Sequence, residues 1–385
     1  MIKPIIKNNI CLNFNPSGCE REVQRQIDYV LNQKRITGPH TALIIGSSMG
    51  YGLAARIVAA FSLKMNTVGV AYERPSGLRR QGSIGWHNTA YLEQQARARN
   101  VKAATVFGDA YSSETKAETA RLLKKEYGRV DLIVYSLASG ARKDPATGVI
   151  HRGVIKPIGR ALPVKTVNLQ TRRIVDAGLE PATGEEIAHT VKVMGGEDWR
   201  LWIEALLAED LLAPGAITVA FSYIGPVLTS PIYRDGTLGR AKLHLESTAH
   251  ELDRLLKAAG GRAFVSVNKA LVTRSSSVIP LVPLYISILY KVMKEKGIHE
   301  GCIEQMFRLF RDRLYADTVR VDREGRIRLD DNELREDVQA GVKRLWRRLE
   351  TGDINEIADL DGFVQEFLAI HGFTATPPSS LGLAG

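Results

Sequence analysis

Short apolar runs alternate with longer segments of mixed polarity between residues 41 and 268. Each of the first four runs ends in a small or acidic residue, and the mixed segments between them have the spacing of amphipathic helices. This alternation predicts a parallel sheet with helices between its strands, and such sheets bind ligands at the carboxyl ends of the strands. The predicted strands cover residues 41–45, 67–72, 103–109, 130–139, 216–222 and 262–268.

The pattern changes in two places. Over about 140–200, short strand-like runs and turns replace the alternation, and a doubly wound sheet needs no connection of this length. After residue 275 the apolar spacing is mostly helical, and a hairpin is expected at 319–329. The helices predicted in this part cover about 283–296, 301–315, 332–349 and 361–370.

We therefore expect one elaborated α/β domain of the Rossmann type. It is a doubly wound parallel sheet with an inserted substrate-side segment and a helical C-terminal extension. Residues 1–40 form an N-terminal segment, residues 41–275 the dinucleotide-binding core with its insertion at about 140–200, and residues 276–385 the helical extension. A helix over about 238–259 joins the fifth and sixth strands.

The segment GSSMGYG at residues 46–52 joins the first strand to a helix over 53–61. A strand, a glycine turn and a helix start form a phosphate cradle, because the free N–H groups and the positive dipole end of the helix attract a diphosphate. Gly46 permits the tight turn, the later glycines let the backbone approach the ligand, and Ser47 and Ser48 add hydroxyl donors. The spacing G-x3-G-x-G is more typical of short-chain reductases than of G-x-G-x-x-G dehydrogenases.

Acidic residues follow the second and third strands. Glu73 can accept hydrogen bonds from both hydroxyls of an adenosine ribose and would repel a 2′-phosphate, which favours NADH over NADPH. Arg74, Arg79 and Arg80 lie close in the sequence and could instead accept such a phosphate, so the strictness of this preference stays open. Asp109 is well placed to meet an adenine amino group.

Composition agrees with a cytoplasmic enzyme. Hydrophobic residues make up 44% of the 385 residues and charged residues 24%, both ordinary for a globular chain. The most apolar stretch, 278–290, is short and contains two prolines, so we expect no membrane insertion. The first residues, MIKPIIKNN, have no apolar signal-peptide core, and the three cysteines suit reduced thiols.

Neither the cysteines nor the eight histidines have the spacing of metal ligands. There is no H-E-x-x-H pattern, and His244 and His250 are wrongly spaced for one helix face. We therefore expect no metal.

The net charge of +10 bears on possible partners. A basic surface attracts nucleic acid, a membrane surface or an acidic substrate. The arginines are dispersed except in the amphipathic segment 342–349, and no RNA-binding aromatic motif or recognition-helix pattern is present, so we expect no nucleic acid. A phosphate-rich substrate such as coenzyme A and an acidic carrier protein suit this charge equally well.

Candidate catalytic residues follow the fifth strand, at the edge of the sheet expected to face a nicotinamide. The stretch FSYIGPVLTSPIYRDGTLGRAK contains Tyr223, Tyr233 and Lys242, and the last two form a Tyr-x8-Lys pair. A phenol can donate a hydrogen bond or a proton to an oxygen that gains negative charge. A nearby ammonium lowers the cost of that charge and can also bind the ribose hydroxyls of the cofactor.

With these segments in view, the chain resembles the NADH-dependent trans-2-enoyl thioester reductases. This family comprises the enoyl-[acyl-carrier-protein] reductase isozyme with a Tyr-x8-Lys pair and trans-2-enoyl-CoA reductase. The resemblance runs along nearly the whole chain. It is carried by IKPIIKNNICLNFNPSGCE, IIGSSMGYGLAARI, AYERP, VDLIVYSLASGAR, the stretch quoted above, and NKALVTRSSSVIPLVPLYISILYKVMKEKG.

The resemblance implies NADH-dependent reduction of the trans-2 double bond of an enoyl-CoA or enoyl-[acyl-carrier-protein], in fatty acid synthesis or fermentative acyl reduction. It implies hydride delivery to C3, protonation at C2, and a monomeric protein. Tyr233 would be the proton donor, Lys242 a ligand of the cofactor ribose, and Tyr223 a substrate contact. The other implied cofactor contacts are Gly46, Ser47, Ser48, Met49, Gly50, Tyr51, Tyr72, Glu73, Asp109, Ala110, Leu137, Ala138, Leu271, Val272 and Thr273.

Two other functions are possible on the residues alone. Ser277, Tyr290 and Lys294 have the Ser-x12-Tyr-x3-Lys spacing of short-chain alcohol dehydrogenases and ketoreductases. They follow the sixth strand, however, and should lie away from the nicotinamide. A non-catalytic NAD-sensing Rossmann protein would keep the glycine turn but would need neither Tyr233 nor Lys242.

Overall fold

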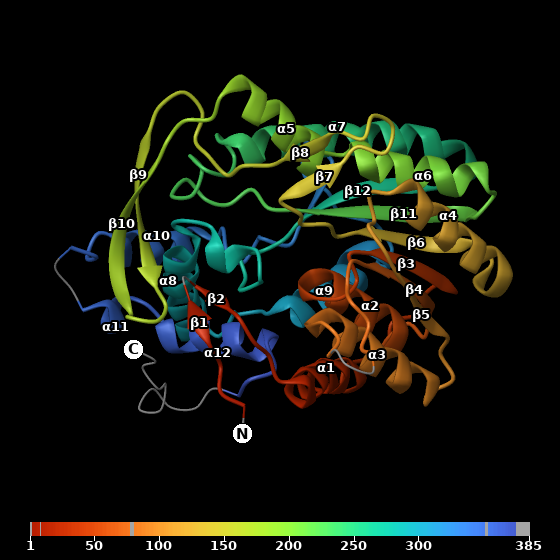
Figure 1. Cartoon of the computed structure of the whole chain (residues 1–385), viewed down its shortest axis with the longest axis horizontal. Helices are drawn as coiled ribbons and strands as arrows, with labels where there is room; N and C mark the ends of the chain where they lie inside the picture. The colour runs from red at the N-terminus through yellow and green to blue at the C-terminus, as the bar shows by residue number, and fades with distance from the viewer. Residues whose placement is uncertain (1, 8, 78–80, 351–352, 375–385) are drawn as a thin grey trace.

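A seven-stranded parallel sheet forms the centre of the protein in the computed structural model, which describes residues 2–7, 9–77, 81–350 and 353–374 (Figure 1). The strand order is β13-β12-β11-β6-β3-β4-β5, so the order reverses between β3 and β6. This is a doubly wound sheet, and the predicted fold class is confirmed. The strands are β3 (Thr41–Ile45), β4 (Asn66–Ala71), β5 (Ala103–Phe107), β6 (Val130–Tyr135), β11 (Leu212–Ser222), β12 (Arg262–Val267) and β13 (Arg326–Arg328).

Helices cover both faces of this sheet (Figure 1). Because successive side chains of a strand point to opposite faces, Ala42 and Ile44 of β3 belong to one hydrophobic core and Leu43 and Ile45 to another. The first core is covered by α1 (Pro16–Leu31), α2 (Gly50–Phe61), α3 (Ile84–Arg97) and α9 (Cys302–Leu309). The second is covered by α4 (Ser113–Leu122), α6 (Glu197–Ala208) and α7 (Thr237–Leu256).

The segment between β6 and α6 leaves the sheet, as expected of an insertion. It contains two antiparallel pairs, β7 (Ala141–Lys143) with β8 (Ile150–Arg152) and β9 (Leu162–Asn168) with β10 (Arg173–Leu179). It also contains a helix that was not predicted, α5 (Gly184–Met194). A capping box starts this helix, because the Thr183 hydroxyl accepts from the Glu186 N–H and the Glu186 carboxylate accepts from the Thr183 N–H.

The predicted helical C-terminal region is present and builds a third hydrophobic core. Its helices pack with β9 and with the ring of Tyr233, so this part of the chain adjoins the insertion. The helices are α8 (Val282–Glu295), α10 (Glu336–Trp346), α11 (Ile354–Ile357) and α12 (Leu360–Ile370), and a helical turn over Phe310–Leu314 continues α9. At the N-terminal end, β1 (Ile6–Lys7) pairs with β2 (Ile10–Cys11).

The hairpin predicted at 319–329 is wrong. A turn does form there, because the Asp322 N–H donates to the Arg326 carbonyl and the Gly325 N–H to the Asp322 carbonyl. The strand that follows, β13, pairs in parallel with β12 at the edge of the main sheet instead of with the residues before the turn. β13 therefore pairs with the edge of β12 that no other strand of the main sheet occupies.

Among the described helices, none combines the length and the apolar character that crossing a membrane requires.

Candidate active site

A cavity of about 1620 Å³ lies along the carboxyl ends of the main sheet, where residues following β3, β4, β5, β6, β11 and β12 all reach its wall. This is the edge at which open parallel sheets bind ligands. Its volume exceeds that of pockets for drug-sized molecules, which are roughly 300–1,000 Å³. The cavity therefore has room for a dinucleotide and a second ligand.

Nearly all the residues predicted to bind cofactor or substrate line this cavity. They are Gly46, Ser48, Met49, Gly50, Tyr51, Tyr72, Glu73, Asp109, Ala110, Leu137, Ala138, Tyr223, Tyr233, Lys242, Leu271, Val272 and Thr273. Ser47, the remaining one, is fully buried outside the lining. Its N–H and its hydroxyl both donate to the Val70 carbonyl, at 3.1 and 3.3 Å. Ser47 thus ties the turn to β4, and its contact with the cofactor stays a prediction.

The glycine turn has the tight geometry of a phosphate cradle. Gly46 has φ of +84°, and a Cβ there would lie 2.3 Å from the Ser136 carbonyl oxygen. A Cβ at Gly52 would lie 1.9 Å from the Gly46 carbonyl oxygen. Any side chain at these two positions would push the turn out of place, and α2 begins at Gly50 with its N-terminus at the cavity. The turn fits the diphosphate of a dinucleotide.

The carboxylate of Glu73, which follows β4, is held in place by its surroundings. The Ser48 hydroxyl donates to Glu73 Oε1 at 2.8 Å, and a Cβ at Gly85 would come within 2.1 Å of the same oxygen. The neighbouring Tyr72 ring is 84% exposed at the rim of the cavity. Two of the arginines considered as phosphate ligands, Arg79 and Arg80, lie outside the described residues.

A buried ion pair holds the loop after β5. Lys116 Nζ donates to the Ala110 carbonyl at 2.9 Å and to Asp198 Oδ1 at 2.7 Å. The Tyr111 N–H donates to Asp109 Oδ1 at 3.0 Å. Burial lowers the pKa of Lys116, while the Asp198 charge opposes that shift. Sequence reasoning missed Lys116 and Asp198, because they lie far apart in the chain and meet only through the packing of α4 on α6.

Tyr223 and Tyr233 lie together in the cavity, with ring centroids 4.6 Å apart and ring planes at 83°. The Tyr223 hydroxyl donates to Glu333 Oε1 at 2.9 Å. The Tyr233 hydroxyl has no hydrogen-bond partner among the described residues. Burial, followed by the Glu333 charge, raises the pKa of both phenols, so both are protonated near neutral pH. Tyr233 alone therefore has its proton free for a ligand.

Lys242 projects from the second turn of α7 into the same cavity. Burial lowers the pKa of its ammonium to about 8, and the charge of Glu246 acts against this shift. Its one hydrogen bond in the described structure is long, 3.4 Å to the Phe221 carbonyl. This ammonium is therefore available to the hydroxyl groups of a ribose.

Among the polar groups of the cavity lining that have no partner in the described part of the chain, two stand at the ends of strands. They are the Ser222 hydroxyl, at the end of β11, and the Asn268 side-chain amide nitrogen, just after β12. Both residues are buried, and unpaired buried polar groups are costly unless a ligand or water satisfies them. Sequence reasoning missed both, although each marks the polar end of an apolar strand.

The three side chains of the alternative short-chain dehydrogenase triad bond groups outside the candidate catalytic residues. The Ser277 hydroxyl donates to the Arg274 carbonyl at 3.2 Å. The Tyr290 hydroxyl donates to Glu366 Oε2 at 2.6 Å, and Lys294 Nζ to Asp359 Oδ2 at 2.7 Å. None of the three lines the cavity. As predicted from their place after the sixth strand, they do not meet the candidate catalytic residues.

The described residues contain no group of three or more His, Cys, Asp or Glu side chains placed to hold a metal ion. The expectation that the protein needs no metal stays a prediction.

Comparison with known families decides the identity. Residues 80–315 match the trans-2-enoyl-CoA reductase catalytic region, and residues 1–77 match the NAD(P)H binding domain of trans-2-enoyl-CoA reductase. The chain belongs to the trans-2-enoyl-CoA reductase family. Its relatives include enoyl-[acyl-carrier-protein] reductases [NADH] of Flavobacterium johnsoniae, 52% identical over 97% of this chain and 94% of the relative, and of Coxiella burnetii, 52% identical over 97% and 93%.

Solved structures of the family have the same fold. The Clostridium acetobutulicum trans-2-enoyl-CoA reductase in complex with NADH is 43% identical, with a TM-score of 0.95 over 98% of this chain and 96% of that one. The Treponema denticola trans-2-enoyl-CoA reductase in complex with NAD is 47% identical, with a TM-score of 0.92 over the same shares, 98% and 96%. The family resemblance seen in the sequence is confirmed.

A third family segment carries the name of a flavin site. Residues 321–376 of this reductase match the enoyl reductase FAD binding domain. In the described part of this segment, β13 leads to α10 through 329–335, a connection without glycine. The described part of the segment thus lacks the strand, glycine turn and helix that hold a dinucleotide diphosphate at Gly46. Its described residues do not fit a flavin diphosphate in that manner, and no flavin step enters the account below.

Proposed function

We propose that this reductase uses NADH to reduce the trans-2 double bond of an enoyl thioester, with Tyr233 as the proton donor and Lys242 as the cofactor-ribose ligand. Family membership makes the chain an NADH-dependent enoyl thioester reductase. What is proposed is the role of each active-site residue. The observation that carries the assignment is the free Tyr233 hydroxyl, which shares the cavity wall with a Tyr223 whose proton is already donated to Glu333.

In this proposal, different residues along the cavity bind different parts of the cofactor. The glycine turn and the N-terminus of α2 bind the diphosphate, Glu73 binds the adenosine ribose, and Asp109 meets the adenine. Lys242 binds the nicotinamide ribose, and the segment 271–273 supports the nicotinamide. When bound, NADH supplies the hydride that C3 of the substrate accepts.

Tyr233 then stabilises the oxygen that gains charge. As C3 accepts hydride, negative charge moves to the thioester oxygen, and a positioned phenol lowers the energy of that enolate by donating a hydrogen bond. Protonation at C2 completes the saturated acyl thioester, with a proton that Tyr233 gives up and regains from solvent. Because the pKa of Tyr233 is raised by burial, the phenol stays protonated and ready to donate across the neutral range.

The acyl chain has an apolar wall to lie against. Ile279, Val282 and Ile286, from the start of the helical extension, line the cavity together with Ile370 of α12. In this proposal residues 41–275 hold the cofactor and residues 276–385 shape the acyl site. Either coenzyme A or an acidic carrier protein suits the net charge of +10. The monomeric state that the resemblance implies and the cytoplasmic location expected from the composition complete the proposal.

The proposal is tested by following NADH oxidation with crotonyl-CoA, with a longer trans-2-enoyl-CoA and with an enoyl-[acyl-carrier-protein]. Butyryl-CoA, which lacks the double bond, and acetoacetyl-CoA, which offers a ketone, serve as controls. Turnover of an enoyl thioester but of neither control supports the proposal. Turnover of the ketone alone would favour a ketoreductase, and NADH binding without turnover of any thioester would favour a sensor.

Glu73 should set the preference for NADH. Glu73→Ala should weaken NADH binding about tenfold and bring the Kd values for NADH and NADPH closer together, because it removes both the ribose acceptor and the charge that repels a 2′-phosphate. Ser48→Ala is a matched control that removes only the hydroxyl that holds Glu73. It should move the two Kd values in the same direction but by less. An unchanged ratio in Glu73→Ala would count against this role.

Cofactor binding should weaken in alkaline solution. Lys242 has a folded-state pKa of about 8, below its ordinary value, so the ammonium is present below that pH and is lost as the pH rises through it. The Kd for NADH should therefore increase above about pH 8. Burial also lowers the pKa of the nearby cavity residue Lys269 to about 8, so the Lys242→Met variant is needed to assign the effect. The rise in the Kd for NADH above about pH 8 should be absent from Lys242→Met. A rise that persists in full in this variant would assign the effect to another group, such as Lys269.

A further inference from the structure

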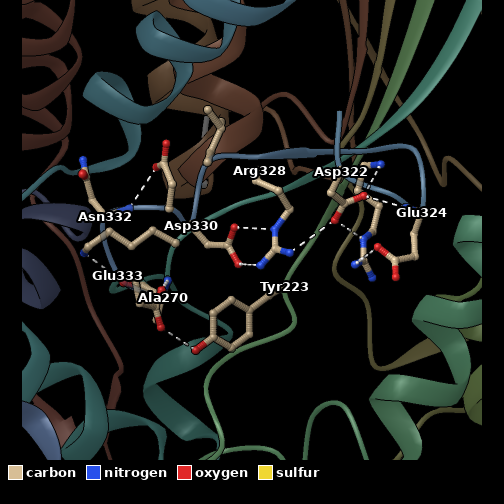
Figure 2. A network of polar contacts seen from close by, with 12 residues as sticks. Tyr223, Ala270, Asp322, Glu324, Arg328, Asp330, Asn332 and Glu333 are labelled. Carbon is tan, nitrogen blue, oxygen red and sulfur yellow. Dashed lines mark hydrogen bonds and ion pairs between the residues drawn. The ribbon is translucent and has the colours of Figure 1, made fainter. Parts of the chain in front are cut away.

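Glu333 is a fully buried carboxylate directly behind the active-site wall. It lies in the loop between β13 and α10, where the Leu329 N–H donates to the Val267 carbonyl at 2.9 Å and so ties the loop to the end of β12. Figure 2 shows the Tyr223 hydroxyl directed at the Glu333 side chain, with Ala270 beside it. Glu333 does not line the cavity, whereas Tyr223 and Ala270 do.

Every described group that bonds the Glu333 carboxylate is a donor. Oε1 accepts from the Tyr223 hydroxyl at 2.9 Å and from the Tyr285 hydroxyl at 2.6 Å, and Oε2 accepts from the Ala270 N–H at 2.7 Å. An ionised carboxylate accepts on both oxygens, whereas a carboxylic acid must donate from one of them. The Ala270 N–H can only donate, and with both tyrosine hydroxyls donating as well, the contacts fit the ionised form.

Three groups around Glu333 favour its ionised form and act against the effect of burial. Burial raises the pKa of Glu333 above its ordinary value, and the Tyr285 hydroxyl, the Ala270 N–H and the Lys269 charge offset only part of this shift. Lys269 is itself buried, and its ammonium donates to the Ala270 carbonyl at 3.1 Å. The N–H and the carbonyl of Ala270 are thus held by a carboxylate and an ammonium, and Ala270 leads directly into the segment 271–273.

We propose that Glu333 is a positioning residue of the reductase site, which takes the Tyr223 proton and anchors Ala270, so that Tyr233 is the only tyrosine of the pair left to donate. This inference rests on the proposed function. Tyr223 can have a single hydroxyl proton, and Glu333 accepts it. Tyr223 can then offer only lone pairs to the cavity, and its ring fixes the neighbouring Tyr233 ring at 83°. Glu333 therefore assigns different roles to two adjacent phenols.

The test is a double-mutant cycle that combines Glu333→Gln with Tyr223→Phe, measured as kcat and KM for an enoyl-CoA, with Kd for NADH and Tm for each variant. Glutamine keeps the volume but brings an NH2 group, so it cannot accept from all three donors. Glu333→Gln should lower kcat about tenfold in the wild-type background, because misplaced groups in a site cost this much or more. It should lower kcat by less than this in Tyr223→Phe, since the part of the loss that acts through Tyr223 is then gone and only the Ala270 anchor remains to be lost.

Asp330→Asn is the matched control. Asp330 is a buried acid in the same loop, but it bonds Arg328 and does not reach the cavity. This control should lower Tm without changing kcat, KM or the Kd for NADH. If Glu333→Gln does not fold, Glu333→Asp, which keeps the charge on a shorter side chain, takes its place in the cycle.

The outcomes separate the two proposals. Absence of turnover of every enoyl thioester in the wild type, on coenzyme A and on the carrier protein alike, would refute the proposed function. Turnover in the wild type that Glu333→Gln leaves unchanged, or losses from Glu333→Gln and Tyr223→Phe that multiply as independent effects, would overturn the Glu333 inference alone. A loss in Glu333→Gln that Asp330→Asn reproduces would also overturn it, because that result points to damage of the loop.

Discussion

Replacing Tyr233 with phenylalanine should lower kcat for enoyl thioester reduction by roughly two to four orders of magnitude, the range typical of a lost general acid. The substitution removes only the hydroxyl, and the ring that packs against Tyr223 is kept. Because the glycine turn, Glu73 and Lys242 are unchanged, the Kd for NADH should stay within about twofold. Steady-state kinetics with crotonyl-CoA and a fluorescence titration with NADH measure the two quantities.

Tyr223→Phe is the matched control for Tyr233→Phe. Both rings lie in the same cavity, but the Tyr223 proton is donated to Glu333, so its hydroxyl cannot protonate a substrate at the same time. We expect a smaller loss of kcat from Tyr223→Phe than from Tyr233→Phe. A larger loss from Tyr223→Phe, or a Tyr233→Phe variant within fivefold of the wild type, would contradict the assignment of the proton donor.

Lys242→Met should weaken NADH binding about 10- to 100-fold, which corresponds to ~1.5–3 kcal/mol for hydrogen bonds made by a charged group. It should lower kcat/KM at least as much, because a misplaced nicotinamide cannot reach C3. Methionine keeps most of the length of the lysine stem. Since burial disfavours the Lys242 charge, its removal should not lower Tm.

Lys294→Met separates this assignment from that of a short-chain dehydrogenase. Lys294 pairs with Asp359 away from the cavity, and both side chains are partly exposed. Its replacement should cost at most about 1 kcal/mol of stability and should leave kcat/KM and the Kd for NADH unchanged. The reverse pattern, an active Lys242→Met variant and an inactive Lys294→Met variant, would transfer catalysis to the Ser277, Tyr290 and Lys294 triad.

Local pattern was sufficient for six of the seven strands of the main sheet and for most of the cavity wall. Buried parallel strands are apolar on both faces, so their residues form unbroken runs, and those runs end where the chain turns at the carboxyl edge. Predicted strand 41–45 coincides with β3 (Thr41–Ile45), and 262–268 exceeds β12 (Arg262–Val267) by one residue. Because ligand-binding residues follow strand ends in such folds, the same pattern located Glu73 and Asp109.

Sequence reasoning failed where distant partners decide the structure. The turn at 322–325 was recognised, but the partner of β13 is β12, and nothing in the local sequence indicates that pairing. The missed helix α5 is different, because the capping box of Thr183 and Glu186 is a local pattern that could have predicted it.

Glu333 could not have been found from its neighbours in the sequence. It stands in the polar stretch DDNELRED, where a glutamate is ordinarily a solvated surface residue. Its burial comes from α8, which brings Tyr285, and from the loops after β11 and β12, which bring Tyr223 and Ala270. The four groups meet only in the folded chain.

The central claim, hydride delivery to C3 of an enoyl thioester, is tested most directly by the position of an isotope. The reductase would be incubated with crotonyl-CoA and NADH deuterated at the transferred position of the nicotinamide, and the product analysed by mass spectrometry and NMR. We predict butyryl-CoA with one deuterium at C3, and one further deuterium at C2 when the solvent is D2O. Crotonyl-CoA and a longer enoyl thioester recovered unreduced, or deuterium found at a carbinol carbon after incubation with a ketone, would contradict the account.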